Sequence, residues 1–191
     1  MDKRKRVWYP GAQYHIMTRG NRRSDIFRSE EDFVVYLRIL LAAKKKYPFY
    51  LYAYCLMDNH IHLQIETINV ELWRIMHYIN SVYSKYFNET YNLIGHLFQG
   101  RYYAECINTD AYMLQTNRYI HLNPVKAKMV RKPAEYEWSS YKSYISFVLM
   151  ELVDNERFIQ NFKDINAYIA FIEDTNIHIS DLQIEILLED D

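Results

Sequence analysis

Two cysteines are present in the whole sequence, and no long hydrophobic run occurs in it. Cys55 and Cys106 lie far apart and form no CxxC pair, which argues against a disulfide framework or a zinc ribbon and predicts reduced thiols. No segment reaches membrane-spanning length, and the basic stretch at residues 3–6 is not followed by the apolar core of a signal peptide. We therefore expect a cytoplasmic protein with no membrane partner.

The chain also has almost no net charge. Its 191 residues carry 23 Lys and Arg against 24 Asp and Glu, a formal charge of −1, which by itself argues against a polyanionic partner. The distribution reverses that argument, because residues 1–145 carry 21 basic and 13 acidic side chains (+8), whereas residues 146–191 carry 2 and 11 (−9). Such asymmetry is typical of a polyanion-binding body with an acidic appendage. We predict a polyanion-binding body over residues 1–145 and an acidic helical extension over residues 146–191.

Apolar and aromatic side chains are abundant. Half of the residues are hydrophobic and a quarter are charged, as in an ordinary globular domain, and 19 tyrosines stand against nine phenylalanines. Most of these tyrosines are expected to be core residues or, on the surface, stacking platforms for nucleic-acid bases.

Hydrophobic periodicity and turn signals predict the order of secondary structure. We expect strands at 14–19, 49–56, 60–67 and 101–107, and helices at 29–46, 70–87 and 110–122, the last ended by Pro124. The order β-α-β-β-α-β predicts an α+β, ferredoxin-like split βαβ fold with a four-stranded antiparallel sheet, helices on one face, and an added helix packed on this assembly. A further helical period at 154–172 predicts a helix in the acidic extension, with an apolar face docked on the body.

His60 and His62 form the sharpest local feature. Alternate residues of a strand point to the same side, so the two imidazoles are expected to lie side by side, where they could share a metal ion. By itself the pattern is weak, because ordinary packed or hydrogen-bonded histidines are the commoner cause of it.

Tyr119 and Asn123 are four residues apart on a predicted helix and therefore on one of its faces. A phenol can attack a phosphodiester, while an amide oxygen can complete a His-His-Asn metal site whose divalent cation polarises the phosphate. Among 19 tyrosines, spacing alone would not select Tyr119.

At these residues the sequence resembles the HUH-superfamily single-tyrosine transposases, and most closely their REP-associated tyrosine transposase branch. The matching segments occur in the family's order at 14–21 (YHIMTRGN), 26–27 (IF), 56–63 (LMDNHIHL), 98–102 (FQGRY), 118–126 (RYIHLNPVK) and 138–141 (WSSY). One departure is Asp58, where many relatives carry proline; it could loosen the turn but removes no ligand.

The resemblance implies a metal pair of His60 and His62, a third ligand from Asn123 and a nucleophile in Tyr119. It also implies cleavage and rejoining of single-stranded DNA, often at hairpin-forming repeats, through a 5′-phosphotyrosine intermediate with Mg²⁺ or Mn²⁺. Imidazole ligands favour Mn²⁺ on grounds of softness. Related single-tyrosine transposases are often dimers, so a homodimer is a further expectation.

Basic residues near these motifs are candidates for binding DNA. They cluster before and after the proposed site, in a body of positive charge, although such clusters also commonly do no more than solvate a surface. We predict DNA contacts from Arg19, Arg22, Arg23, Arg101 and Lys126, with Arg22 and Arg23 the strongest candidates because they lie in a loop.

The other histidines have no ligand spacing. His121 follows Tyr119 by two residues and should point away from it on a helix, so packing or a DNA contact is the expected role. His15, His77, His96 and His178 are expected to be structural or surface residues.

Two other functions are compatible with the pattern. One is a domesticated protein that binds repeat DNA with little or no cleavage, against which the intact four-residue set argues. The other is an RNA-binding module of the same strand order, which gives no reason for His60, His62 and Tyr119 to occur together. The acidic extension could also occupy the basic surface and limit access to DNA.

Overall fold

The computed structural model describes residues 8–146 and 151–174, and its helices and strands follow the predicted order. They are β1 (Gln13–Arg19), α1 (Glu30–Lys46), β2 (Phe49–Met57), β3 (His60–Thr67), α2 (Leu72–Tyr91), β4 (Tyr103–Ile107), α3 (Asp110–Lys126), α4 (Tyr141–Ser146), α5 (Asn155–Ile159) and α6 (Ile165–Glu173). Two short 3₁₀ helices, η1 (Asn21–Arg23) and η2 (Pro133–Glu135), lie between them. The basic stretch at 3–6 and residues 147–150 and 175–191 lie outside the described residues.

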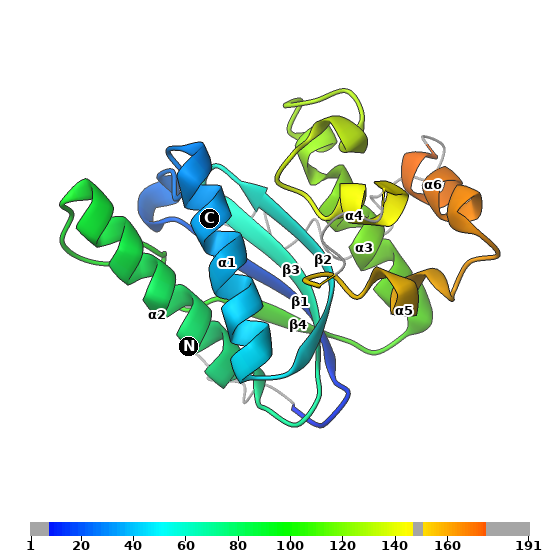
Figure 1. Cartoon of the computed structure of the whole chain (residues 1–191), viewed down its shortest axis with the longest axis horizontal. Coiled ribbons are helices and arrows are strands. Elements are labelled where there is room, and N and C mark those ends of the chain that lie inside the picture. The colour runs from blue at the N-terminus through cyan, green and yellow to red at the C-terminus, as the bar shows by residue number, and fades with distance from the viewer. Residues whose placement is uncertain (1–7, 147–150, 175–191) are drawn as a thin grey trace.

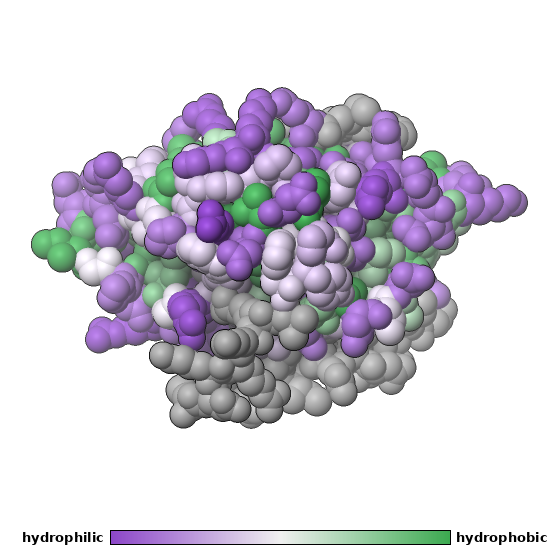
Figure 2. All heavy atoms as spheres, turned by 90° about the horizontal axis from the view of Figure 1, so that it is seen from below, coloured by the Kyte–Doolittle hydropathy of each residue, from purple (hydrophilic) through white to green (hydrophobic). Residues whose placement is uncertain are grey.

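The four strands form one antiparallel sheet in the order β2-β3-β1-β4, which confirms the predicted ferredoxin-like α+β fold. Helices α1 and α2 cover one face of the sheet, and the added helix α3, with α4 to α6 beyond it, lies on the other (Figure 1). Within the described parts of the chain, no helix is long and apolar enough to cross a membrane. On the surface that Figure 2 presents, hydrophobic residues form small separate patches among hydrophilic ones.

Strand β3 is buried on both faces, and the two faces differ in chemistry. Ile61, Leu63 and Ile65 belong to the main hydrophobic core. The alternate residues His60, His62, Gln64 and Glu66 point to the opposite face, where the Gln64 side chain donates a hydrogen bond to the Met113 carbonyl of α3 at 3.0 Å. The polar side of β3 therefore lies under α3.

The hairpin turn at Asp58 and Asn59, which precedes His60, is held by the segment that follows β1. The Asp58 carbonyl accepts a hydrogen bond from the Ile26 amide at 2.7 Å, and the Asn59 carbonyl accepts one from the Gly20 amide at 2.8 Å. These bonds fix the beginning of β3. The turn is therefore anchored through its backbone, and the aspartate at position 58 does not prevent this.

Helix α1 begins at the predicted cap, and its first turn is tied to α2. The buried Asp32 carboxylate accepts hydrogen bonds from the Arg28 and Ser29 amides and from the hydroxyls of Tyr86 and Tyr91. A carboxylate at the N-terminus of a helix is also favoured by the helix dipole. Two tyrosines thus hold the helix layer together with their hydroxyls as well as their rings.

The expectation that Pro124 ends the added helix is wrong, because α3 continues to Lys126. Proline removes its own amide proton, and its ring crowds the carbonyl four residues earlier, but both effects act on the turn before it. The carbonyls of Asn123 and Pro124 still accept hydrogen bonds from the Ala127 and Met129 amides, at 2.9 and 3.0 Å. The last turn therefore survives, and it includes Lys126, whose ammonium lies over the Tyr119 ring.

The single helical period at 154–172 is divided into two helices, α5 and α6. The side chain of Asp164 accepts a hydrogen bond from the Ala167 amide at 2.8 Å, so a new N-cap begins α6 inside the expected helix. Phe158, Tyr168 and Ile172 are buried in the same core as the body.

One hydroxyl links α6 to α3. Tyr168 makes hydrogen bonds to Asn117 Oδ1 at 2.9 Å and to His121 Nδ1 at 2.8 Å, and all three side chains are completely buried. On its other side, His121 Nε2 lies 2.7 Å from Ser140 Oγ. The described part of the C-terminal segment therefore docks on α3 through polar contacts as well as apolar ones.

Replacing Tyr168 by phenylalanine tests this docking. The ring is retained, but two buried polar atoms lose a partner, so the free energy of unfolding should fall by about 1–3 kcal/mol, measured by urea denaturation. Tyr103→Phe is the matched control, because the Tyr103 side chain is exposed on β4; its stability should be unchanged. An equally stable Tyr168→Phe protein would contradict the proposed role of the hydroxyl.

Candidate active site

The two histidines of β3 lie together as the strand pattern predicts. The ring centroids of His60 and His62 are 5.0 Å apart and the rings are nearly perpendicular, at 89°. His62 is completely buried and His60 is half-buried at the end of the strand. One imidazole therefore lies inside the protein while the other reaches the surface.

In both rings the Nδ1 atom is engaged by a neighbouring residue. His60 Nδ1 lies 2.7 Å from Asn59 Oδ1, and His62 Nδ1 lies 3.0 Å from His15 Nε2. The carbonyl oxygen of Asn59 can only accept, so Nδ1 of His60 carries the proton. This leaves His60 Nε2 as a lone-pair donor for a ligand.

Asn123 meets both histidines from α3. Its Nδ2 atom lies 3.3 Å from His62 Nε2, and its side chain also hydrogen-bonds to His60. With an amide donating to Nε2, the proton of His62 resides on Nδ1 and is donated to His15. Rotating the amide by half a turn would present its oxygen in place of the nitrogen. The three side chains predicted as metal ligands therefore converge.

Tyr119 lies one turn before Asn123 and packs on His62 and His15 of its own chain. Its ring is edge-on to His62, with centroids 5.5 Å apart, and edge-on to His15 at 5.7 Å. The Lys126 ammonium lies 5.1 Å from the centroid of the Tyr119 ring. All four residues of the predicted set thus lie in one site, next to a lysine that was predicted to contact DNA.

Burial keeps the imidazoles of the site neutral. Desolvation lowers the pKa of His15 and of His60 to about 4 and holds the pKa of His62 well below its usual value of 6.5. The charge of Arg19 lowers the pKa of His60 and His62 further. Neutral imidazole is the form that binds metals, so no proton has to be displaced near pH 7.

The donor set suits a divalent cation with two nitrogen ligands and one amide oxygen. Among the described residues, no group of three His, Cys, Asp or Glu side chains could hold a metal ion. Asn123 is therefore needed as a third protein ligand if His60 and His62 bind one. The positions fit this assignment, because the Asn123 side chain lies within hydrogen-bonding distance of His62 and also hydrogen-bonds to His60.

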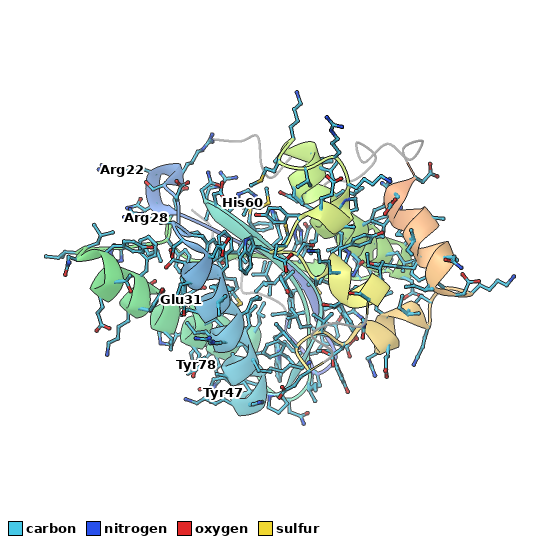
Figure 3. The ribbon with its side chains drawn as sticks, turned by 45° about the horizontal axis from the view of Figure 1, so that its top comes forward. Arg22, Arg28, Glu31, Tyr47, His60 and Tyr78 are labelled. Atoms are coloured by element: carbon cyan, nitrogen blue, oxygen red, sulfur yellow. The ribbon has the colours of Figure 1, made fainter. Side chains whose placement is uncertain are left out.

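The predicted DNA-binding residues lie at the same end of the sheet. Arg19 is the cross-strand partner of His60, and Figure 3 shows His60 and Arg22 toward one end of the molecule, away from Tyr47 and Tyr78. Arg22 and Arg23 are exposed in η1, with left-handed φ angles of 55° and 59°. Arg101 is exposed in the loop before β4, and Lys126 is exposed at the end of α3.

His15 is the site residue that sequence reasoning missed. It was expected to be structural or at the surface, yet it is 5 % exposed, hydrogen-bonded to His62 and stacked on it with 18° between the rings. Because β1 pairs with β3 with Met17 opposite His62, His15 shares the face of the histidine pair. The sequence places His15 on the same face of β1 as Met17 and Arg19, but it does not show that this face pairs with His62 and His60.

The remaining histidines divide between core and surface. His121 is buried and bonded to Ser140 and Tyr168, so it packs in the core and does not meet the site. His77 and His96 are exposed on α2 and in the loop after it, and His178 lies outside the described residues.

Two proteins of known structure are similar to this chain. The chain is similar to a REP-associated tyrosine transposase bound to a REP hairpin, with 19% identity and a TM-score of 0.64, over 76% of this chain and 86% of that one. It is also similar to a putative transposase from Deinococcus radiodurans R1, with 16% identity and a TM-score of 0.44, over 63% and 95% of the two chains. No curated protein sequence matches. The first of these similarities shows a shared fold.

The comparison with family models uses the sequence itself, and it shows family membership as well as fold. The family model described as "Transposase IS200 like" matches residues 9–123, from the segment before β1 to the Asn123 of the site. This match covers well over half of the chain and includes His15, His60, His62 and Tyr119. The chain therefore belongs to the IS200-like transposase family.

Proposed function

We propose that this protein cleaves and rejoins single-stranded DNA at hairpin-forming repeats, with Tyr119 as the nucleophile and a divalent metal ion held by His60, His62 and Asn123. One observation carries the proposal: all four side chains converge within one chain, with Asn123 Nδ2 3.3 Å from His62 Nε2 and the Tyr119 ring packed on His62. The structure of a similar protein, a REP-associated tyrosine transposase, has a REP hairpin bound, which supports hairpin DNA as the substrate.

The reaction is a transesterification at phosphorus. The Tyr119 oxygen attacks a phosphate of the strand, an O–P bond forms, and the bond from phosphorus to the 3′ oxygen breaks. The phenol gives up its proton and the departing 3′ oxygen gains one, which leaves a 5′-phosphotyrosine and a free 3′-hydroxyl. Attack by another 3′-hydroxyl on the phosphotyrosine reverses these steps and rejoins the strands.

A bound Mg²⁺ or Mn²⁺ would polarise the phosphate, and two imidazole ligands favour Mn²⁺. The protein's own groups orient the ligands and stabilise the developing charge. The His15 side chain fixes the tautomer and the ring plane of His62 through the Nδ1 hydrogen bond. Lys126, whose ammonium lies beside the Tyr119 ring, favours the negative charge that develops on the phenol and phosphate oxygens.

Substrate binding falls to the basic residues around the site. Arg19 and Lys126 flank the four-residue set, and Arg22, Arg23 and Arg101 lie in loops from which they can reach phosphates. Because Tyr119 packs on His62 of its own chain, the proposal needs no second subunit to supply a site residue; a homodimer would be compatible with it.

Tyr119→Phe should abolish the covalent protein–DNA adduct, because phenylalanine has no nucleophilic oxygen, and should leave hairpin affinity within about twofold of the wild type. Both are measured with a labelled hairpin oligonucleotide, by denaturing gel and by fluorescence anisotropy. Tyr112→Phe, on the same helix, is the matched control and should form the adduct normally. An adduct with the Tyr119→Phe protein would exclude this nucleophile. Wild-type protein that binds the hairpin but never forms an adduct would indicate a DNA-binding protein that does not cleave.

His60→Ala and His62→Ala should each weaken Mn²⁺ binding, measured by isothermal titration calorimetry, by at least the roughly 100-fold that loss of a supporting residue can cost. Metal-dependent cleavage should disappear with it. Tyr119→Phe serves as the control, since it alters the same site without removing a ligand. If either alanine variant cleaved at the wild-type rate in the presence of chelator, the metal assignment would be wrong.

His15→Phe should lower Mn²⁺ affinity by about 10–100-fold, as expected when the hydrogen bond that orients a ligating histidine is lost. His15→Gln should restore part of the affinity, because its side-chain oxygen can accept the bond from His62 Nδ1. The ¹⁵N shifts of His62 in the metal-free protein give an independent measurement, since they report the tautomer. Wild-type shifts and affinity in His15→Phe would show that His15 only fills space.

A further inference from the structure

Helix α6 packs against α3 at the turn that carries Tyr119 (Figure 1). Arg118, the residue before Tyr119, is 2 % exposed, and its Nε atom donates a hydrogen bond to the Phe171 carbonyl at 2.9 Å. A terminal nitrogen of the same guanidinium donates to the Asp174 carbonyl. Carbonyls at the C-terminal end of a helix lack partners within the helix, and a positive charge is favoured there. Arg118 therefore fastens the end of α6 to the helix of the proposed nucleophile.

A chain of buried hydrogen bonds continues from α6 across α3, and one backbone carbonyl sets its direction. The Met113 carbonyl can only accept, so Gln64 presents its NH₂ group to Met113 and its oxygen to Asn117. Asn117 in turn presents its NH₂ group to Gln64 and its oxygen to Tyr168. The Tyr168 hydroxyl therefore gives its single proton to Asn117 Oδ1, and from His121 it can only accept.

The tautomer of His121 follows from this chain. Its Nδ1 atom lies 2.8 Å from the Tyr168 oxygen and must carry a proton. Its Nε2 atom lies 2.7 Å from Ser140 Oγ, and a completely buried ring with two hydroxyl partners is neutral, so Nε2 accepts. Ser140 Oγ in turn accepts a hydrogen bond from the Tyr54 amide of β2 at 2.9 Å. His121 thus connects α3 to α6 on one side and, through Ser140, to the sheet on the other.

This chain restrains the rotation of α3 about its axis. Asn117 and His121 are one helical turn apart and share the Tyr168 hydroxyl, while Tyr119 lies between them in the sequence and packs on His62. A helix with its side chains has a radius of about 5–6 Å, so a rotation of roughly 10° moves a side-chain atom by about 1 Å. Misplacement of a reacting group by about 1 Å can slow a reaction about 100-fold.

We infer that His121 and Tyr168 are positioning residues for strand cleavage: through their hydrogen bonds, α6 holds α3 at the rotation in which Tyr119 can attack the phosphate. This inference rests on the proposed function and extends it to a segment beyond the residues that the family model matches, which end at Asn123. Both side chains are completely buried, so they act through α3 and not by contact with DNA.

Histidine side-chain ¹H–¹⁵N spectra of the full-length, metal-free protein test the hydrogen-bond chain. His121 should show the neutral tautomer with its proton on Nδ1, assigned by its loss in His121→Asn. The signal should shift in Tyr168→Phe, because phenylalanine offers no oxygen to accept the proton. A wild-type His121 with its proton on Nε2 would overturn the chain.

Single-turnover cleavage of a labelled hairpin oligonucleotide, in saturating Mn²⁺ and at increasing protein concentration, tests the positioning role. At saturating protein, His121→Phe should lower the rate at least about tenfold and Tyr168→Phe at least about threefold. The half-saturating protein concentration should stay within about twofold of the wild type, because the DNA contacts are unchanged. His121→Asn should recover part of the rate lost in His121→Phe, since its amide nitrogen can donate to Tyr168.

Tyr86→Phe is the matched control, because it removes a hydroxyl bonded to Asp32 in the helix layer on the other face of the sheet; it should cleave at the wild-type rate. All rates are compared at a temperature at which urea denaturation shows each variant to be folded. If His121→Phe does not fold, Tyr168→Phe and His121→Asn still provide the test.

An unchanged saturating rate in folded Tyr168→Phe protein would overturn the positioning role, as would an equal loss in Tyr86→Phe or a change confined to the half-saturating concentration. Wild-type protein that never cleaves would instead overturn the proposed function, and the positioning role with it. The His121 tautomer would still decide whether the hydrogen-bond chain exists.

Discussion

The contact between the polar face of β3 and helix α3 is the constraint on which the site depends. Gln64 donates to the Met113 carbonyl and accepts a hydrogen bond from Asn117, so the strand and the helix are joined in the middle of their contact by buried amides. Burying such groups without partners would cost several kcal/mol. The register of α3 on the sheet is therefore fixed, and with it the position of Tyr119 and Asn123 over His60 and His62.

The same burial determines the chemistry of the histidines. Because His15 on β1 and His62 on β3 are shielded from water, protonation of either ring is disfavoured, and the ring nitrogens need hydrogen-bond partners. His62 has one on each nitrogen, His15 at Nδ1 and Asn123 at Nε2. Neutral, oriented imidazole is the form that binds a divalent metal ion, so under the proposed function the packing that stabilises the fold would also prepare His60 and His62 as ligands.

Sequence reasoning predicted the fold well because the information was local: alternation in β1 and β3, the cap of α1 and the turn at Asp58 each reside in a few consecutive residues. It brought together His60, His62, Tyr119 and Asn123, although their roles stay predictions. His15 could not be selected, because its contact depends on the cross-strand register of β1 and β3. The break between α5 and α6 depends on one competing cap at Asp164, and the survival of α3 past Pro124 on two backbone bonds.

Two acidic residues of the C-terminal segment make ion pairs away from the site, and not on the basic surface beside it. Glu151 and Asp154 pair with Lys45 and Lys44, at 2.6 and 2.7 Å, near the end of α1. That end leads into the first residues of β2, which pair with the last residues of β3, Glu66 and Thr67, and not with His60. In the described part of the segment, these two carboxylates therefore neutralise lysines remote from the site, where they anchor the segment. The positive charge that favours DNA resides at the other end of the sheet, with Arg19 and Arg22.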